Sequence, residues 1–101
     1  FAEHNSNYSA AYKNIFDWIS RIEKDVWLNK PMFLLATSPG GRGGASVLAI
    51  AVSAYGYSNK NTIVQFSLPL FNENFSEDSG IQNSELKESF NKQLSFFKEA
   101  L

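Results

Sequence analysis

The chain of 101 residues contains no cysteine, one histidine and one methionine. Without cysteine there are no disulfides and no thiolate chemistry, which fits a reducing compartment, so we expect a cytoplasmic protein. His4 alone is too little for a histidine-based metal site. We therefore expect no metal in this protein.

A strong charge of either sign is also missing. Lysine and arginine number 9, aspartate and glutamate number 10, and the formal net charge is -1. Both kinds are mixed along the chain, which leaves no electrostatic footprint for nucleic acid or a membrane surface. No apolar run approaches the ~20 residues of a membrane span. With 44% hydrophobic and 19% charged residues, the composition indicates one small globular domain.

Glycine is concentrated in one place. Residues 37–45 read TSPGGRGGA, the apolar run Met32–Ala36 precedes them, and the small-residue segment 46–54 follows with a helical pattern. A strand, a turn and a helix in this order place the turn at the carboxyl ends of a parallel sheet, where ligands bind. Glycine lets a ligand approach the backbone closely, and amide groups of the turn and the helix can then donate to it.

Two familiar phosphate motifs do not fit this turn. A P-loop needs Lys and then Ser or Thr after its last glycine, but Ala45 and Ser46 follow Gly44. A dinucleotide fingerprint, G-x-G-x-x-G, fails because Ser46 stands at the third glycine position. Four glycines in five positions still exceed what a tight turn needs. We predict a ligand-binding loop, with a turn that binds no ligand as the alternative.

Hydrophobic spacing predicts an alternation of helices and strands after a short N-terminal loop. The predicted elements are a helix over 8–23, a strand over 32–36, a helix over 46–54, a strand over 62–70, a loop over 72–83 and a helix from 84 to the C-terminus. Asn7 or Ser9 is the expected N-cap of the first helix, and Ser84 that of the last. Gly56 is expected to end the middle helix.

This order implies right-handed crossovers and a parallel sheet, hence an α/β fold. Two strands are too few, because a stable sheet needs three or more, and strand 32–36 would expose a hydrophobic edge. We expect further strands from an upstream segment or from a partner chain. The broad apolar face of the first helix, widened by Phe16 and Trp18, faces either the core or another subunit.

Four stretches spread along the chain are similar to those of a known protein family. They are FAEHN at 1–5, AYKNIFDW at 11–18, Lys30-Pro31 with SPGGRGG at 38–44, and LFNENF at 70–75. Together they resemble the NADPH-dependent FMN reductase family. The resemblance implies a flavodoxin-like, three-layer fold with five parallel strands in the order 2-1-3-4-5. The chain would be its C-terminal half, a single partial domain over 1–101 with strands 4 and 5 and their flanking helices. Strands 1–3 and the loop that holds the FMN phosphate would be absent.

The resemblance also implies the residues that hold the cofactor. In the family two loops hold the isoalloxazine ring of FMN, and they correspond here to Glu3, His4 and Asn5 and to Ser38, Gly40, Gly41 and Gly44. Backbone amides of such loops can donate to the flavin's acceptors and stabilise negative charge on the reduced ring. No catalytic side chain is expected, because hydride passes between NADPH and FMN themselves. Arg42 is expected to be exposed, to pair across a subunit interface or to meet an NADPH phosphate.

Two hypotheses follow. The first is an enzyme, an NAD(P)H-dependent FMN reductase that passes electrons to a quinone, an azo compound or a metal ion. It rests on the two flavin loops. The second is a half-domain without turnover that folds by pairing with another chain, and it rests on the missing phosphate loop and the open sheet edge. We expect a homo-oligomer, either a dimer or a tetramer.

Overall fold

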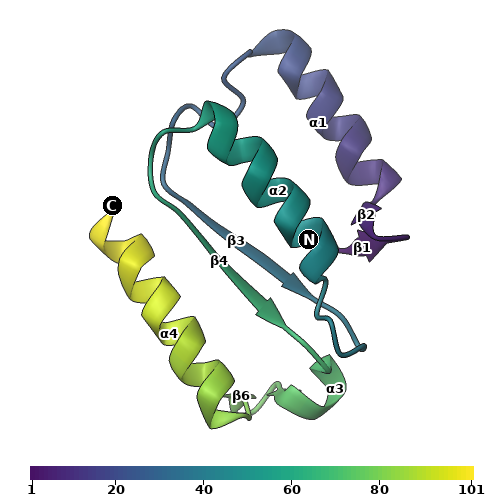
Figure 1. The fold of residues 1–101 in the computed structure, drawn as a ribbon, viewed down its shortest axis with the longest axis vertical. Coiled ribbons are helices and arrows are strands. Elements are labelled where there is room, and N and C mark those ends of the chain that lie inside the picture. Colours follow the sequence, from purple (N-terminus) through teal and green to yellow (C-terminus); the bar gives the residue numbers. More distant parts are fainter.

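The computed structural model describes residues 1–101. Its centre is a parallel pair of strands, β3 (Met32–Thr37) and β4 (Ile63–Leu68). The long helices are α1 (Ala10–Ile22), α2 (Ala45–Ser58) and α4 (Ser84–Glu99). Figure 1 shows α1 and α2 on one side of the sheet and α4 on the other. The predicted α/β class is confirmed, and this three-layer arrangement is a partial flavodoxin-like fold. None of the helices has the length and apolar character that crossing a bilayer requires.

Strand β3 is apolar from Met32 to Ala36, and helices lie on both of its faces. Its register places Leu34 beside Gln65 and Leu35 beside Phe66. Leu34 is buried in the cluster under α2. On the other face Phe33 packs against Phe90 of α4, with ring centroids 5.6 Å apart. Helices on both faces remove the polar alternation of a half-exposed strand, although the α4 side is covered only in part, because Leu35 is 42% exposed there.

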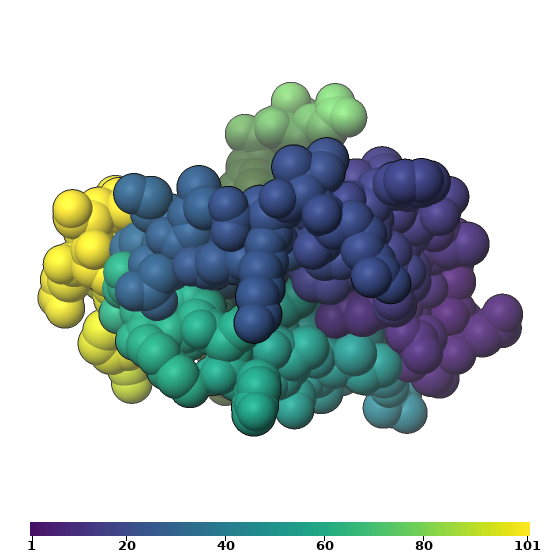
Figure 2. Space-filling model, turned by 90° about the horizontal axis from the view of Figure 1, so that it is seen from above, coloured from purple at the N-terminus to yellow at the C-terminus, as the bar shows by residue number.

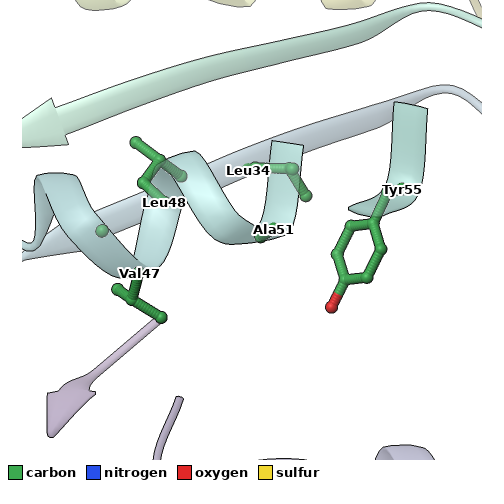
Figure 3. Close-up of a cluster of buried hydrophobic side chains, with 6 residues drawn as sticks. Leu34, Val47, Leu48, Ala51 and Tyr55 are labelled. Atoms are coloured by element: carbon green, nitrogen blue, oxygen red, sulfur yellow. The ribbon is translucent and has the colours of Figure 1, made fainter. Parts of the chain in front are cut away.

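The main core lies between α2 and β3 (Figure 3). Its members are Leu34, Ala36, Val47, Leu48, Ala51 and Tyr55. Val47 and Ala51 have no exposed surface, and the small side chains along α2 let the helix approach the strand closely. Tyr55 points away from the sheet and joins α1 to this core, because its hydroxyl shares a hydrogen bond with that of Tyr12.

Helix α1 begins where its cap residue can satisfy a free amide. Ser9 is the N-cap and accepts a hydrogen bond of 3.2 Å from the amide of Tyr12, so one of the two predicted caps is confirmed. The inner face of α1 packs through Tyr12 and Phe16 against Tyr55. Figure 2 shows α1 and the connection after it lying over α2, with the C-terminal end of α4 at one end of the molecule.

Two predicted helix boundaries were wrong. Helix α2 continues through Gly56 to Ser58, and the buried Asn59 ends it. The amide of Asn59 bonds to the carbonyl oxygen of Tyr55 at 2.7 Å, so the final turn is satisfied without a left-handed glycine. Helix α4 is capped by Asn83 and not by Ser84, because the Asn83 side chain accepts from the amide of Leu86 at 3.0 Å.

Short elements fill the segments that were expected to be loops. The N-terminal residues form a hairpin of β1 (Glu3–His4) and β2 (Asn7–Tyr8). The segment after β4 contains the short helix α3 (Phe71–Asn74) and a second hairpin, β5 (Phe75–Ser76) with β6 (Gly80–Ile81). Both hairpins are too short to leave a period-two pattern in the sequence.

Candidate functional site

The glycine loop, residues 38–44, joins β3 to α2 at the carboxyl ends of the two strands. Groups at and beyond the end of β4 hold its backbone. The hydrogen bonds run from Ser67 Oγ to the Gly43 carbonyl (2.8 Å), from the Leu70 amide to the Gly40 carbonyl (2.9 Å) and from the Phe71 amide to the Ser38 carbonyl (3.0 Å). With three carbonyl groups fixed in this way, the loop has a defined shape before any ligand arrives.

The glycines of this loop divide into two pairs. Gly43 and Gly44 are buried and have positive φ of 59° and 76°. A β-carbon on Gly43 would lie 2.4 Å from the Ser67 hydroxyl, and one on Gly44 would lie 3.0 Å from the Ala36 β-carbon. Packing alone therefore requires glycine at these two positions. The predicted cofactor role of Gly44 is not needed to explain that residue.

Gly40 and Gly41 form the other pair, and both are exposed. A β-carbon on Gly41 would meet nothing within 4 Å, and one on Gly40 would approach only the Ser38 hydroxyl, at 3.9 Å. Neither has positive φ. No packing constraint within the chain explains these two glycines, so they are the part of the loop that a ligand can approach.

Free hydrogen-bond donors lie on this open part of the loop. The amide groups of Gly40, Gly41 and Arg42 donate no hydrogen bond within the chain. Arg42 is exposed, and its guanidinium donates to the Ser46 hydroxyl at 2.7 Å. No carboxylate side chain belongs to the loop. The surface thus offers donors without a competing negative charge, which suits an electron-rich ligand.

The second predicted loop is the turn of the N-terminal hairpin. Asn5 and Ser6 have φ of 51° and 64°, the positive pair of a type I′ turn that closes a two-residue hairpin tightly. His4 and Asn5 are exposed on it. The short N-terminal loop that the sequence predicted is therefore a compact hairpin turn.

Glu3 connects this hairpin to the glycine loop. Its carboxylate oxygen Oε1 accepts a hydrogen bond of 2.8 Å from the amide of Val47, in the first turn of α2. Because α2 begins directly after Gly44, this bond brings the hairpin to the end of the glycine loop. The side chain of Glu3 is thereby engaged within the protein, which leaves its backbone for any ligand.

Sequence reasoning missed an apolar cavity of about 500 Å³ on the α4 side of the sheet. Its walls come from five separate parts of the chain, among them Phe1, Leu35, Phe66, Phe71, Ile81 and Phe90. Lys87 is the one charged residue in its wall. No local sequence pattern predicts this cavity, because the residues that line it are far apart in the sequence. Its size is in the range of small-molecule pockets.

Two tyrosines near the hairpin have shifted pKa values. Burial, with a smaller contribution from the neighbouring Tyr8, raises the pKa of Tyr12 from its ordinary 10.0 to about 12. Burial also raises the pKa of Tyr8, against a smaller opposing effect of Lys13. Both phenols therefore stay neutral at physiological pH, and act as packing and hydrogen-bonding groups.

The fold and the glycine loop define a class, that of flavodoxin-like α/β proteins whose ligand loop lies at the carboxyl ends of parallel strands. A model of the NADPH-dependent FMN reductase family matches residues 1–73. The match covers most of the chain, and the chain belongs to this family. No curated protein and no solved structure matches it.

Membership makes the chain a protein of flavin-reductase type, that is, an oxidoreductase, with FMN and NADPH as the cofactors of the family. Every residue predicted to hold the flavin lies inside the matched range, and α4 lies outside it. The free amides around Gly41 fit a flavin, because the pyrimidine edge of its ring carries carbonyl and nitrogen acceptors.

Proposed function

We propose that this chain binds the isoalloxazine ring of FMN and serves NAD(P)H-dependent FMN reduction. The ring would be held by Glu3, His4 and Asn5 in the hairpin and by Ser38, Gly40, Gly41 and Gly44 in the glycine loop. One observation carries the proposal: three amides without partners lie on a surface that has no β-carbon at Gly41. Family membership supports the choice of ligand.

The residues have different roles in this proposal. The amides of Gly40 and Gly41 donate to acceptors at the ring edge, and in a fixed loop they need no reorganisation to do so. The Ser38 hydroxyl makes only a long bond of 3.4 Å to the Gly40 carbonyl, so it can turn toward a ligand. Gly44 allows the close approach of α2 to β3 that fixes the loop. When bound, FMN would supply the redox chemistry, taking a hydride from the nicotinamide and passing electrons to a small acceptor such as a quinone or an azo compound.

Gly41→Val tests the ring site. The added side chain enters open space, so the fold remains while the ring loses its approach to the backbone. Gly56→Val is the matched control, because Gly56 is also exposed with nothing near its missing β-carbon, but lies in the last turns of α2. We expect FMN affinity to fall about tenfold or more in the first variant only. Equal affinities in a fluorescence titration would remove the glycine loop from the site.

We further propose that residues 1–101 form the C-terminal half of the flavodoxin-like domain. The open edge of β3 supports this. The Met32 amide bonds to the Thr62 carbonyl in the β4 direction, so the backbone groups of Phe33, Leu35 and Thr37 point to the other edge. No strand of the chain pairs with this edge, where the carbonyl oxygen of Leu35 accepts a hydrogen bond of 2.5 Å from the N-terminal amine of Phe1. The same edge favours the second candidate function, a half-domain that pairs with another chain and has no turnover alone.

A homo-oligomer, a dimer or a tetramer, is part of the proposal. The outer face of α1 supports it, because Ala11, Ile15, Trp18 and Ile22 follow one another at spacings of four, three and four residues. The last three are 61%, 68% and 87% exposed. This outer α1 stripe has the spacing of a helix-pairing seam, and the two-fold packing of two such stripes would cover both.

A further inference from the structure

We infer that Glu3 is a positioning residue that locks the two ring-binding loops into one unit by capping α2. The consequence for FMN rests on the function proposed above. The coupling of the loops is a property of the chain itself and can be measured without a flavin. The role assigned here belongs to the Glu3 side chain, whose carboxylate bonds to the Val47 amide within the chain.

Helix α2 has no cap of its own. Its N-cap residue is Gly44, which offers no side-chain hydrogen bond, and its first turn contains no acidic residue. A normal cap accepts from the amide of the second or third helical residue. The third residue of α2 is Val47, and it is this amide that donates to Glu3 at 2.8 Å. Glu3 thus replaces an N-cap side chain from 44 positions away in the sequence.

The loop geometry explains why the cap comes from so far away. Serine, aspartate or asparagine at position 44 would have to adopt a φ of 76° and would bring a β-carbon to 3.0 Å from that of Ala36. The tight β3–α2 connection therefore excludes the usual capping residues. A carboxylate from another segment satisfies the amide instead, and its negative charge also suits the positive end of the helix.

The hairpin transmits this contact to the residues that face the ligand. Glu3 pairs with Tyr8 and His4 pairs with Asn7, and the turn between them is a closed type I′ turn. Fixing Glu3 therefore fixes His4 and Asn5 as well. At the other end of the bond Val47 has no exposed surface, and Figure 3 shows its side chain on the side of α2 that faces the N-terminal hairpin. The bond thus joins the hairpin to the first turn of α2.

The experiment compares Glu3→Ala and Glu3→Gln with wild type. Glu77→Ala is the control, because Glu77 is an exposed acid in the turn between β5 and β6. Hydrogen exchange followed by NMR reports the amides of Val47 and of the hairpin. We expect Glu3→Ala to raise their exchange rates about tenfold and Glu3→Gln, which keeps an acceptor, to raise them less. Unchanged exchange at Val47 in Glu3→Ala would overturn the coupling.

A titration with FMN provides the second measurement. We expect the Kd to rise about three- to tenfold in Glu3→Ala, with partial recovery in Glu3→Gln and no change in Glu77→Ala. Faster exchange with an unchanged Kd would overturn the positioning role and leave the flavin site standing. A wild-type chain that binds no flavin would overturn the proposed function, and the exchange rates would then decide the coupling alone. If Glu3→Ala loses its circular dichroism signal, Glu3→Gln carries both measurements.

Discussion

The hydroxyl of Ser67 donates a 2.8 Å hydrogen bond to the carbonyl oxygen of Gly43, and so ties the glycine loop to β4. The contact is possible only because residue 43 has no β-carbon, which would lie 2.4 Å from the same hydroxyl. One residue pair thus fixes both the path of the loop and the identity of one of its glycines. The open surface at Gly40 and Gly41 depends on that path.

Gly43→Ala is therefore expected to destabilise the fold. The methyl group meets Ser67 and the backbone after it, and alanine is strained at a φ of 59°. We expect a loss of about 2 to 4 kcal/mol in the free energy of unfolding, from left-handed strain and overpacking together. Gly41→Ala, with open space around it, should stay within about 0.5 kcal/mol of wild type. Urea unfolding of the two variants measures the difference, and similar midpoints would refute this assignment.

Asn59→Ala is expected to destabilise the fold, because Asn59 links the end of α2 to the residues just before β3. The side-chain nitrogen Nδ2 of the buried Asn59 donates to the Lys30 carbonyl at 2.8 Å, and the side-chain oxygen Oδ1 accepts from the Asn61 backbone amide at 2.8 Å. Alanine leaves the Lys30 carbonyl and the Asn61 amide without these partners, which we expect to lower the free energy of unfolding by about 1 to 3 kcal/mol. The exposed Asn72 supplies the control Asn72→Ala, which should leave the melting temperature unchanged. A melting temperature equal to wild type for Asn59→Ala would count against the cap.

Stability should fall as the pH rises above 10. The pKa of Tyr12 is about 12 in the folded chain and 10.0 when unperturbed, so the unfolded chain releases this proton first. Between these two values the folded state binds more protons, and the free energy of unfolding decreases with pH. Tyr12→Phe should flatten this decrease. Thermal unfolding at several pH values, together with phenolate absorbance, measures both effects. Ionisation of all tyrosines near 10 would contradict the burial of Tyr12.

Mutation of the outer α1 stripe should lower the molar mass of the oligomer in solution. We expect the wild-type chain, 11.3 kDa as a monomer, to scatter light as a dimer or larger. Trp18→Ser combined with Ile22→Ser should yield the monomer, because both side chains face outward. Tyr57→Ser removes an equally exposed aromatic residue from α2 and should leave the mass unchanged. A wild-type chain that elutes and scatters as a monomer would refute the interface.

Local patterns predicted much of this fold. The apolar run Met32–Ala36 indicated a strand covered on both faces, and a strand with a helix on each face forms there, with the α4 side covered only in part. Ser9 before a periodic apolar segment indicated a helix start and is the cap of α1. These predictions succeeded because each depends on neighbours within one turn or one strand.

Other features could not be predicted, because they depend on contacts between distant segments. Gly56 resembled a helix end, but the buried side chain of Asn59 lets α2 run on. The sequence gives no means of separating Gly43 from Gly41, because the difference is the position of Ser67 in the next strand. Likewise Glu3 was predicted as a flavin residue, while its side chain meets Val47, 44 positions away.

The most informative single measurement is a parallel titration of the chain with FMN and with riboflavin, followed by flavin fluorescence. The proposed contacts are all with the isoalloxazine ring, and under the half-domain proposal the loop that holds the FMN phosphate lies outside residues 1–101. We therefore expect both ligands to bind with Kd values within about threefold of each other. Binding of FMN without riboflavin would locate the contacts at the phosphate, and quenching of neither would show that these two loops do not form a flavin site in this chain.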